Sequence, residues 1–179
     1  AWCDTAQAFY KGTRMRRADV LESALALGTP LVELTGGEPL LQPGTIPLLT
    51  ELCDAGKTVL IETSGEADVS RVDRRVHKIM DLKAPGSKES HRNRWANLAH
   101  IDARDELKFV LADRADYEWM RRTIGERSLS SLGATLLASP VWGSLDPKDL
   151  VAWVLEDGLP VRVQVQLHKI IWGADAQGV

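Results

Sequence analysis

Cysteine is scarce in this chain, because its 179 residues contain only Cys3 and Cys53. Two thiols are too few for a disulfide scaffold, and this usage is typical of a reducing cytoplasm, where we expect the protein to act. No apolar run is long enough to span a bilayer and no secretory leader is recognisable, so we expect no membrane partner. The formal net charge is only -3, which provides no field to attract nucleic acid.

The composition itself is that of a globular protein, with 44% hydrophobic and 26% charged residues. The length suits one unit with its own hydrophobic core. Neither an internal repeat nor a low-complexity linker divides the chain. We therefore predict a single domain over residues 1–179.

Short apolar segments alternate along the chain with longer amphipathic ones. The short β-branched runs predict strands, and apolar spacing of three or four residues predicts helices. Gly56 is placed to end the first helix, and Asp146-Pro147 is typical of a helix start. Residues 86–104 are polar and irregular, which predicts a long loop with at most a short helix. The expected strands are 29–35, 57–62, 77–82, 106–111, 134–138 and 162–167, and the expected helices are 46–55, 115–127 and 146–157.

This alternation predicts an α/β fold with a mainly parallel sheet, either open or barrel-like. The most unusual segments all lie at or after the ends of predicted strands: TGGEP, ETSG, DLKAPGS, SPVWG and QLHK. Because the carboxyl ends of parallel strands share one edge, we expect the five segments to form one binding site.

Three of these segments have two interpretations each. The paired glycines Gly36 and Gly37 let backbone approach a ligand, but a tight strand-to-helix turn would also use them. Lys83 at a strand end could bind a ligand carboxylate, or it could form an ion pair with Asp81. The hydroxyls of ETSG fit a binding site or an ordinary polar loop.

The last predicted strand places three polar residues, Gln164, Gln166 and His168, on one face. Burying them in an apolar core would be unfavourable, which favours a polar cavity, although a solvated edge strand would also explain them. Cys53 falls within the apolar pattern of a helix and fits a small core residue. The other histidines lack metal-ligand spacing and read as surface residues: His77, His91 and His100.

No Walker loop, GxSxG elbow, HExxH motif or nucleic-acid-binding module occurs in the sequence. The chain begins instead with AWCDT, and this cysteine together with the GGEP segment resembles the radical S-adenosylmethionine (radical SAM) enzymes. In that superfamily a CxxxCxxC loop binds a [4Fe–4S] cluster, and a GGEP-type segment contacts the methionine part of the cofactor. More narrowly, WCDT, TGGEPLL, ETSG, DLKAPGS and QLHKIIWG resemble the 7-carboxy-7-deazaguanine synthase family, from residue 1 to the end of the chain.

This resemblance implies roles for individual residues. Cys3 would be the third cluster ligand, and the cluster would leave one iron position open to the cofactor. Thr5 would give a hydroxyl ligand to Mg²⁺. Thr35 and His168 match substrate-contacting positions. The other matched residues contact S-adenosylmethionine: Trp2, Asp4, Gly37, Asp81, Leu82 and Lys83, with Ser139, Pro140, Val141 and Trp142 as weaker matches.

The resemblance also implies a reaction and partners. An electron from the cluster would cleave the cofactor to a 5′-deoxyadenosyl radical, which takes a hydrogen from C6 of 6-carboxy-5,6,7,8-tetrahydropterin. Ring contraction with loss of ammonia would follow, with Mg²⁺ orienting the substrate carboxylate, in the biosynthesis of 7-deazapurines such as the queuosine precursor. An electron donor such as flavodoxin or ferredoxin and a homodimer are expected.

The sequence departs from the family pattern at its start. The first strand and the first two cluster cysteines are absent, and Cys53 cannot replace them from a later helix. We therefore expect a partial (β/α) barrel of the radical SAM type and an inactive fragment of a longer protein. Two alternatives remain open: another radical SAM enzyme, such as an activase of glycyl-radical proteins, or a cluster-free α/β binding domain.

Overall fold

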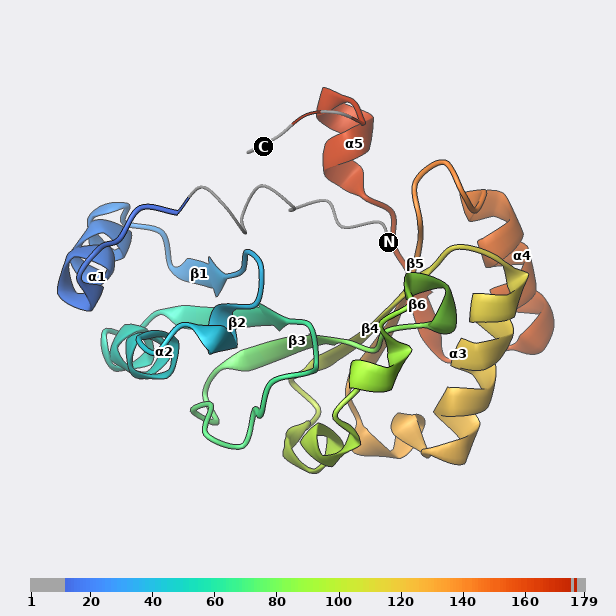
Figure 1. Ribbon diagram of the computed structural model, residues 1–179, viewed down its shortest axis with the longest axis horizontal. Coiled ribbons are helices and arrows are strands. Elements are labelled where there is room, and N and C mark those ends of the chain that lie inside the picture. The colour runs from blue at the N-terminus through green and yellow to red at the C-terminus, as the bar shows by residue number, and fades with distance from the viewer. Residues whose placement is uncertain (1–11, 175, 177–179) are drawn as a thin grey trace.

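The computed structural model describes residues 12–174 and residue 176, and its centre is a sheet of six strands (Figure 1). The strands stand in the order of the chain, and every pairing is parallel. Within the described residues the sheet is open, with β1 and β6 at its two edges. This arrangement confirms an α/β fold consistent with a partial barrel. The strands are β1 (Leu31–Leu34), β2 (Thr58–Thr63), β3 (His77–Asp81), β4 (Glu106–Leu111), β5 (Thr135–Pro140) and β6 (Val161–Val163).

The helices divide into those that cover the sheet and one that stands apart. Helix α2 packs on β1 and β2, whereas α3 and α4 pack on β3, β4 and β5 (Figure 1). Helix α5 follows β6 and lies away from α2, α3 and α4. No helix in the described part of the chain is long and apolar enough to cross a membrane. The helices are α1 (Arg17–Ala26), α2 (Thr45–Asp54), α3 (Arg114–Glu126), α4 (Pro147–Asp157) and α5 (Leu167–Trp172).

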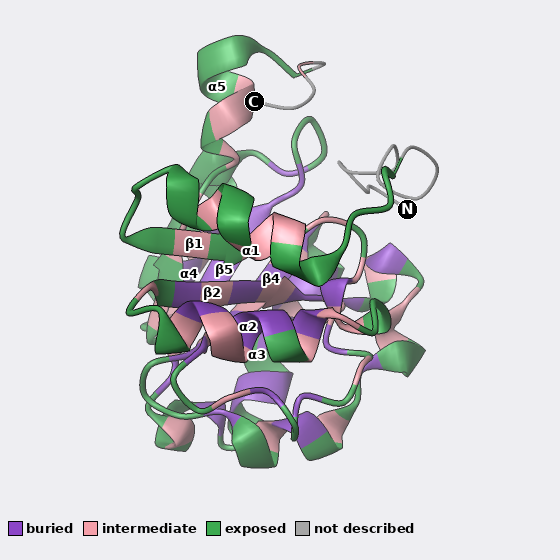
Figure 2. Ribbon diagram, turned by 90° about the vertical axis from the view of Figure 1, so that its left-hand side faces the viewer, coloured by how far each residue is buried: buried purple, intermediate pink, exposed green. Residues whose placement is uncertain are grey.

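Two apolar clusters fix the helices to one face of the sheet. Leu49 of α2 packs with Ile61 of β2, and Met120 of α3 packs with Phe109 of β4, all of them fully buried. Figure 2 shows the buried residues concentrated on the sheet and the facing side of α2, whereas α5 has no buried residue. Burial of this apolar area is the main stabilising contribution to the fold.

The opposite face of the sheet carries charged residues among apolar ones such as Leu60, Ile79 and Leu137. Because successive side chains of a strand alternate between faces, the residues beside Ile61 and Phe109 point away from the helices. The parallel register then brings charged residues of neighbouring strands together, with Asp81 of β3 paired to Lys108 of β4. We call this the polar face and define it by Glu33, Glu62, Asp81, Glu106 and Lys108.

The last predicted strand is wrong beyond residue 163. The ladder between β5 and β6 ends after the Gln164 amide donates to the Ala138 carbonyl at 3.0 Å. The next donor along β5 would be Pro140, which has no N–H, so pairing stops there. Residues from Leu167 onward form α5 instead, and His168 therefore does not share a strand face with Gln164.

The other predicted elements agree closely with the structure, and β4 has the predicted ends. The irregular stretch 86–104 contains three short 3-10 turns rather than continuous loop: Pro85–Ser87, Ser90–Arg92 and Trp95–His100. They connect β3 to β4 where a regular βαβ unit would have a helix.

A buried ion pair at the amino end of β3 yields a stability prediction. Lys78 Nζ lies 3.0 Å from Asp105 Oδ2, and the two side chains are 5% and 1% exposed. Replacing Asp105 with Ala leaves the lysine buried without its partner, so we expect the free energy of unfolding to fall by about 3–5 kcal/mol in urea titrations. Asp54→Ala, which removes the exposed partner of Arg75, is the control and should change it by less than about 1 kcal/mol. Equal small losses in both variants would contradict the prediction.

Candidate functional site at the carboxyl edge of the sheet

The carboxyl ends of the strands bring several of the predicted segments together. TGGEP follows β1, ETSG ends β2 and DLKAPGS ends β3, all at the same edge of the sheet (Figure 1). SPVWG leaves β5 at this edge as well. The predicted convergence is therefore present for these four segments, and their side-chain contacts decide what they can do.

Glu38 ties TGGEP to ETSG. Its carboxylate accepts hydrogen bonds from the Ser64 amide at 2.7 Å, the Ser64 hydroxyl at 2.6 Å and the Thr63 hydroxyl at 2.9 Å. It also accepts a bond from the Leu40 amide at 3.0 Å, which closes the turn after β1. Glu38 thus holds two loops in fixed positions, a role that the sequence analysis did not assign.

The two glycines before Glu38 form the turn that leaves β1. Gly36 has φ 132°, a conformation that residues with a side chain rarely adopt. A Cβ placed there would meet no atom within 4 Å, so the space above this peptide is open, and the neighbouring Gly37 is exposed. The exposed turn at Gly37 fits the amino and carboxylate groups of a cofactor such as S-adenosylmethionine.

Asp81 and Lys83 form an ion pair, which is one of the two roles that the sequence suggests for Lys83. Lys83 Nζ donates to Asp81 Oδ2 at 2.6 Å. The other carboxylate oxygen, Asp81 Oδ1, is buried and has no hydrogen-bond partner within the described residues. Leu82, between them, has its side chain in the apolar core, so it can offer a ligand only backbone. The segment therefore presents one acceptor whose bond is not satisfied by the described protein.

Two buried residues from outside the site hold the DLKAPGS segment. Asn93 accepts a bond from the Lys83 amide at 2.8 Å and donates to the Lys83 carbonyl at 2.9 Å. Asp116 of α3 accepts a bond from the Gly86 amide at 2.8 Å, and a Cβ at Gly86 would lie 2.5 Å from this carboxylate. The backbone around Lys83 is thus held by contacts with two buried side chains.

Lys108 and Glu62 form a second ion pair on the polar face. Lys108 Nζ contacts Glu62 Oε1, and the Thr35 hydroxyl donates to Glu62 Oε2 at 3.1 Å. Burial alone would raise the pKa of Glu62, but the charge and hydrogen bond of Lys108 lower it overall. Burial likewise would lower the pKa of Lys108, but attraction to Asp81 and Glu62 raises it. Both groups are therefore charged at neutral pH.

Glu33 adds a third carboxylate to this region. Burial and the negative charge of Glu62 raise its pKa, while Lys108 opposes the rise. The polar face therefore carries more negative than positive charge near Thr35, and Lys108 is the cation that Glu33 and Glu62 share.

The β5 segment and α5 line a groove of about 580 Å³. Ser139 and Val141 are buried, whereas Trp142 is exposed and forms part of the groove wall with Val165 and Ile170. His168 is on α5, after the edge strand β6, whereas Thr35 follows the opposite edge strand β1. In the described chain the two predicted substrate residues therefore follow strands at opposite edges of the sheet.

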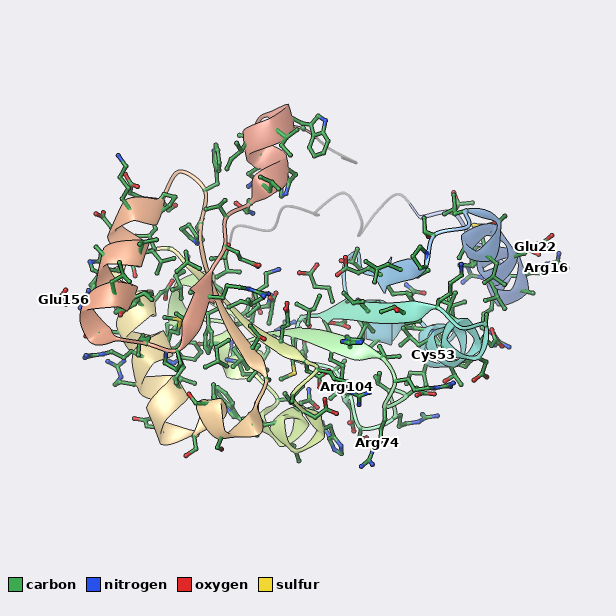
Figure 3. All side chains as sticks on the ribbon, turned by 180° about the vertical axis from the view of Figure 1, so that it is seen from behind. Arg16, Glu22, Cys53, Arg74, Arg104 and Glu156 are labelled. Carbon is green, nitrogen blue, oxygen red and sulfur yellow. The ribbon has the colours of Figure 1, made fainter. Side chains whose placement is uncertain are left out.

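The two predicted metal ligands, Cys3 and Thr5, are not among the residues that the structure describes. Trp2 and Asp4 lie outside the described residues as well. Cys53 is near the end of α2, next to Asp54 (Figure 3). Asp54 lies 2.7 Å from Arg75, which is in the loop before β3. Cys53 is therefore at the amino edge of the sheet. Burial raises the pKa of this thiol. Residues 12–174 contain no cluster of three or more His, Cys, Asp or Glu side chains that could hold a metal.

The comparisons with solved structures support the fold. The chain is similar to Streptococcus suis SuiB bound to S-adenosylmethionine, with a TM-score of 0.58 and 12% identity over 92% of this chain and 45% of that one. It is similar to SuiB bound to its precursor peptide SuiA with a TM-score of 0.59 and 11% identity, over 87% and 43% of the two chains. These are radical SAM enzymes, and at this identity the likeness establishes the fold.

The curated relatives are much closer in sequence. The 7-carboxy-7-deazaguanine synthase of Chlorobaculum tepidum is 46% identical over 182 residues, which cover 99% of this chain and 82% of that protein. Those of Koribacter versatilis and Thermoplasma acidophilum are 39% and 33% identical, covering 100% and 99% of this chain and 85% and 84% of theirs. No protein-family model matches the chain. This chain belongs to the 7-carboxy-7-deazaguanine synthase family of radical SAM enzymes.

The lowered pKa of Glu62 predicts a pH dependence of stability. A carboxyl group with a lowered pKa stabilises the fold above its unfolded-state pKa of about 4.3, and this contribution disappears as the pH falls through the folded-state value. Between about pH 5 and about pH 3 the wild type should therefore lose more unfolding free energy than Glu62→Gln, as measured by urea titration at each pH.

Glu66→Gln is the matched control, because Glu66 is 54% exposed and its contact with Arg92 is at the surface. Its stability should follow that of the wild type through the acid range. Parallel curves for the wild type and Glu62→Gln would show that the Lys108 contact does not stabilise the fold.

Proposed function

We propose that this protein converts 6-carboxy-5,6,7,8-tetrahydropterin to 7-carboxy-7-deazaguanine, with loss of ammonia, in 7-deazapurine biosynthesis. The observation that carries the proposal is the joining of Thr35, Glu62, Asp81 and Lys83 at the carboxyl edge of a radical SAM sheet. These residues come from three strand ends, and the family relationship extends over nearly the whole chain. The conversion is redox-neutral overall, because the substrate keeps all of its carbon atoms and loses only one nitrogen and three hydrogens, as ammonia.

The chain's own residues fit S-adenosylmethionine. The exposed backbone at Gly37 would hold the methionine end, with Lys83 as the cation for a carboxylate. The unsatisfied Asp81 Oδ1 would accept a bond from a hydroxyl or amino donor. Trp142 and the groove beside it would bury an apolar part of the cofactor. When bound, S-adenosylmethionine and the [4Fe–4S] cluster supply the hydrogen-abstracting radical.

The cluster and the metal are assigned to residues near the start of the chain. Cys3 would be a cluster ligand, with Trp2 and Asp4 against the cofactor, and Thr5 would ligate Mg²⁺ through its hydroxyl. The protein would orient the pterin through Thr35 and, from α5, through His168. Its further task is to exclude water from the reacting atoms.

We further propose that the complete protein adds a first strand and two more cluster cysteines. Residues 1–179 would then be one domain that lacks its first barrel strand. Among described residues β1 pairs only with β2, which leaves its other edge to receive a parallel strand. The curated relatives are longer than the matched region, which spans 82% to 85% of the first three. Such a protein would act as a cytoplasmic homodimer, reduced by a flavodoxin or ferredoxin.

The function is tested by anaerobic reconstitution of the complete protein with iron and sulfide. Incubation with the carboxypterin, S-adenosylmethionine, Mg²⁺ and a reductant should yield 7-carboxy-7-deazaguanine and ammonia, identified by mass spectrometry. A reconstituted cluster that cleaves S-adenosylmethionine but leaves the pterin unchanged would point to another radical SAM activity. Absence of cluster formation despite the additional cysteines would favour a binding domain.

The magnesium assignment predicts the behaviour of Thr5→Ala in the same protein. Removing one hydroxyl ligand should raise the Mg²⁺ concentration needed for half-maximal turnover by about 10-fold, while the iron–sulfur absorbance stays unchanged. Thr58→Ala, at the amino end of β2, is the control and should leave both unchanged. Loss of the cluster absorbance in Thr5→Ala would show that the threonine has a different role.

A further inference from the structure

Lys108 occupies the centre of the polar face but matches none of the family's cofactor or substrate positions. It comes from β4, and its side chain is 20% exposed. Its ammonium group contacts Glu62 of β2 and lies 3.9 Å from Asp81 Oδ1 of β3. One cation therefore faces carboxylates from two other strands.

Those two carboxylates lead to the two ligand sites. Glu62 accepts a hydrogen bond of 3.1 Å from the hydroxyl of Thr35, the residue that matches a substrate position. Asp81 accepts a hydrogen bond of 2.6 Å from the ammonium group of Lys83, the residue that matches a cofactor position. A continuous series of polar contacts thus connects Thr35 to Lys83, and Lys108 is its central member.

The carboxylates depend on this cation. Glu62 and Asp81 are largely buried, with side chains 32% and 17% exposed, and the neighbouring Glu33 adds a third negative charge. Carboxylates that share a partly buried region repel one another, and without a counter-charge they take up protons or turn away. Either response would move the acceptor atoms that Thr35 and a ligand donor need.

One acceptor in this series, Asp81 Oδ1, is not used by a hydrogen bond within the described residues. Asp81 Oδ1 is buried and lacks a hydrogen-bond partner in the described part of the chain, since Lys108 at 3.9 Å is too far to donate. A ligand N–H or O–H would complete it. Such a bond would act directly on the carboxylate that shares Lys108 with Glu62.

We propose that Lys108 is a positioning residue that couples the pterin site to the S-adenosylmethionine site. It holds Glu62 and, through Glu62, the Thr35 hydroxyl, while its charge attracts Asp81 and keeps Asp81 Oδ1 oriented toward a ligand donor. A ligand at either end therefore alters the same shared cation. The inference rests on the proposed function, because the pterin and S-adenosylmethionine are the ligands that it couples.

The test measures binding in the complete reconstituted enzyme by anaerobic calorimetry. The affinity for the carboxypterin is determined with and without S-adenosylmethionine, for the wild type, Lys108→Met and Lys108→Arg. In the wild type S-adenosylmethionine should strengthen pterin binding by about fivefold or more. Lys108→Met should weaken pterin binding by about 10-fold to 100-fold and abolish that strengthening, because hydrogen bonds to charged groups are lost.

Lys108→Arg retains the charge, so it should recover most of the coupling even if the pterin affinity is lower. Arg162→Met is the matched control, because it removes another cation that faces a polar-face carboxylate, Glu106, at 2.7 Å. It should bind both ligands as the wild type does. Urea titration of each variant identifies any general loss of stability.

Wild-type coupling in Lys108→Met would overturn the proposal, as would equal weakening in Lys108→Met and Arg162→Met. If Lys108→Met does not fold, loss of coupling in the folded Lys108→Arg variant would also overturn it, because the charge is still present. A wild type that binds S-adenosylmethionine but not the carboxypterin would instead contradict the proposed function. The two failures are therefore distinguishable.

Discussion

Parallel strand pairing is the constraint on which the rest of the molecule depends. Because all six strands run the same way, the segments that leave their carboxyl ends emerge at one edge. Helices α2, α3 and α4 stabilise this sheet from one side only, through two separate apolar clusters. The other side is free to carry charge, and Thr35, Asp81 and Lys83 lie where that charged side meets the carboxyl edge.

The polar face is held by a balance of charge rather than by apolar packing. Parallel sheets usually bury both faces under apolar side chains, so charged groups at the centre of this one need another source of stability. Here Glu62, Asp81 and Glu106 each contact a cation, and the surplus acceptor is one oxygen of Asp81. In a buried setting such a surplus is unfavourable until a donor arrives, which is consistent with a site built to receive one.

Much of the fold follows from local patterns in the sequence. The strand ELKFVL was predicted with its observed ends, because an apolar side chain at every second position reflects contact with α3 on one face only. The same alternation in RVQVQL was misleading, since whether a strand continues depends on its neighbour, and Pro140 of β5 cannot donate the next bond. The placement of His168 on α5 could not be predicted for the same reason.

The candidate site was predictable in part. Glycine pairs and strand-end charges mark Gly37, Asp81 and Lys83 in the sequence, and family resemblance marks Thr35. Glu38, Asn93 and Lys108 carry no comparable local signal, because their partners are 25, 10 and 46 residues away in the chain. A charged residue inside an apolar strand was the single available hint for Lys108. The role of Lys108 depends on which strands lie beside β4, and the local sequence does not show this.

The clamp on Lys83 has a thermodynamic consequence. Asn93 fixes both backbone groups of this residue from behind, and Asp116 fixes the nearby Gly86. A loop that is ordered before its ligand arrives loses little conformational entropy on binding, so more of each contact's free energy appears as affinity. The irregular connection between β3 and β4, which has no regular helix, thus helps to hold the DLKAPGS segment in a fixed position.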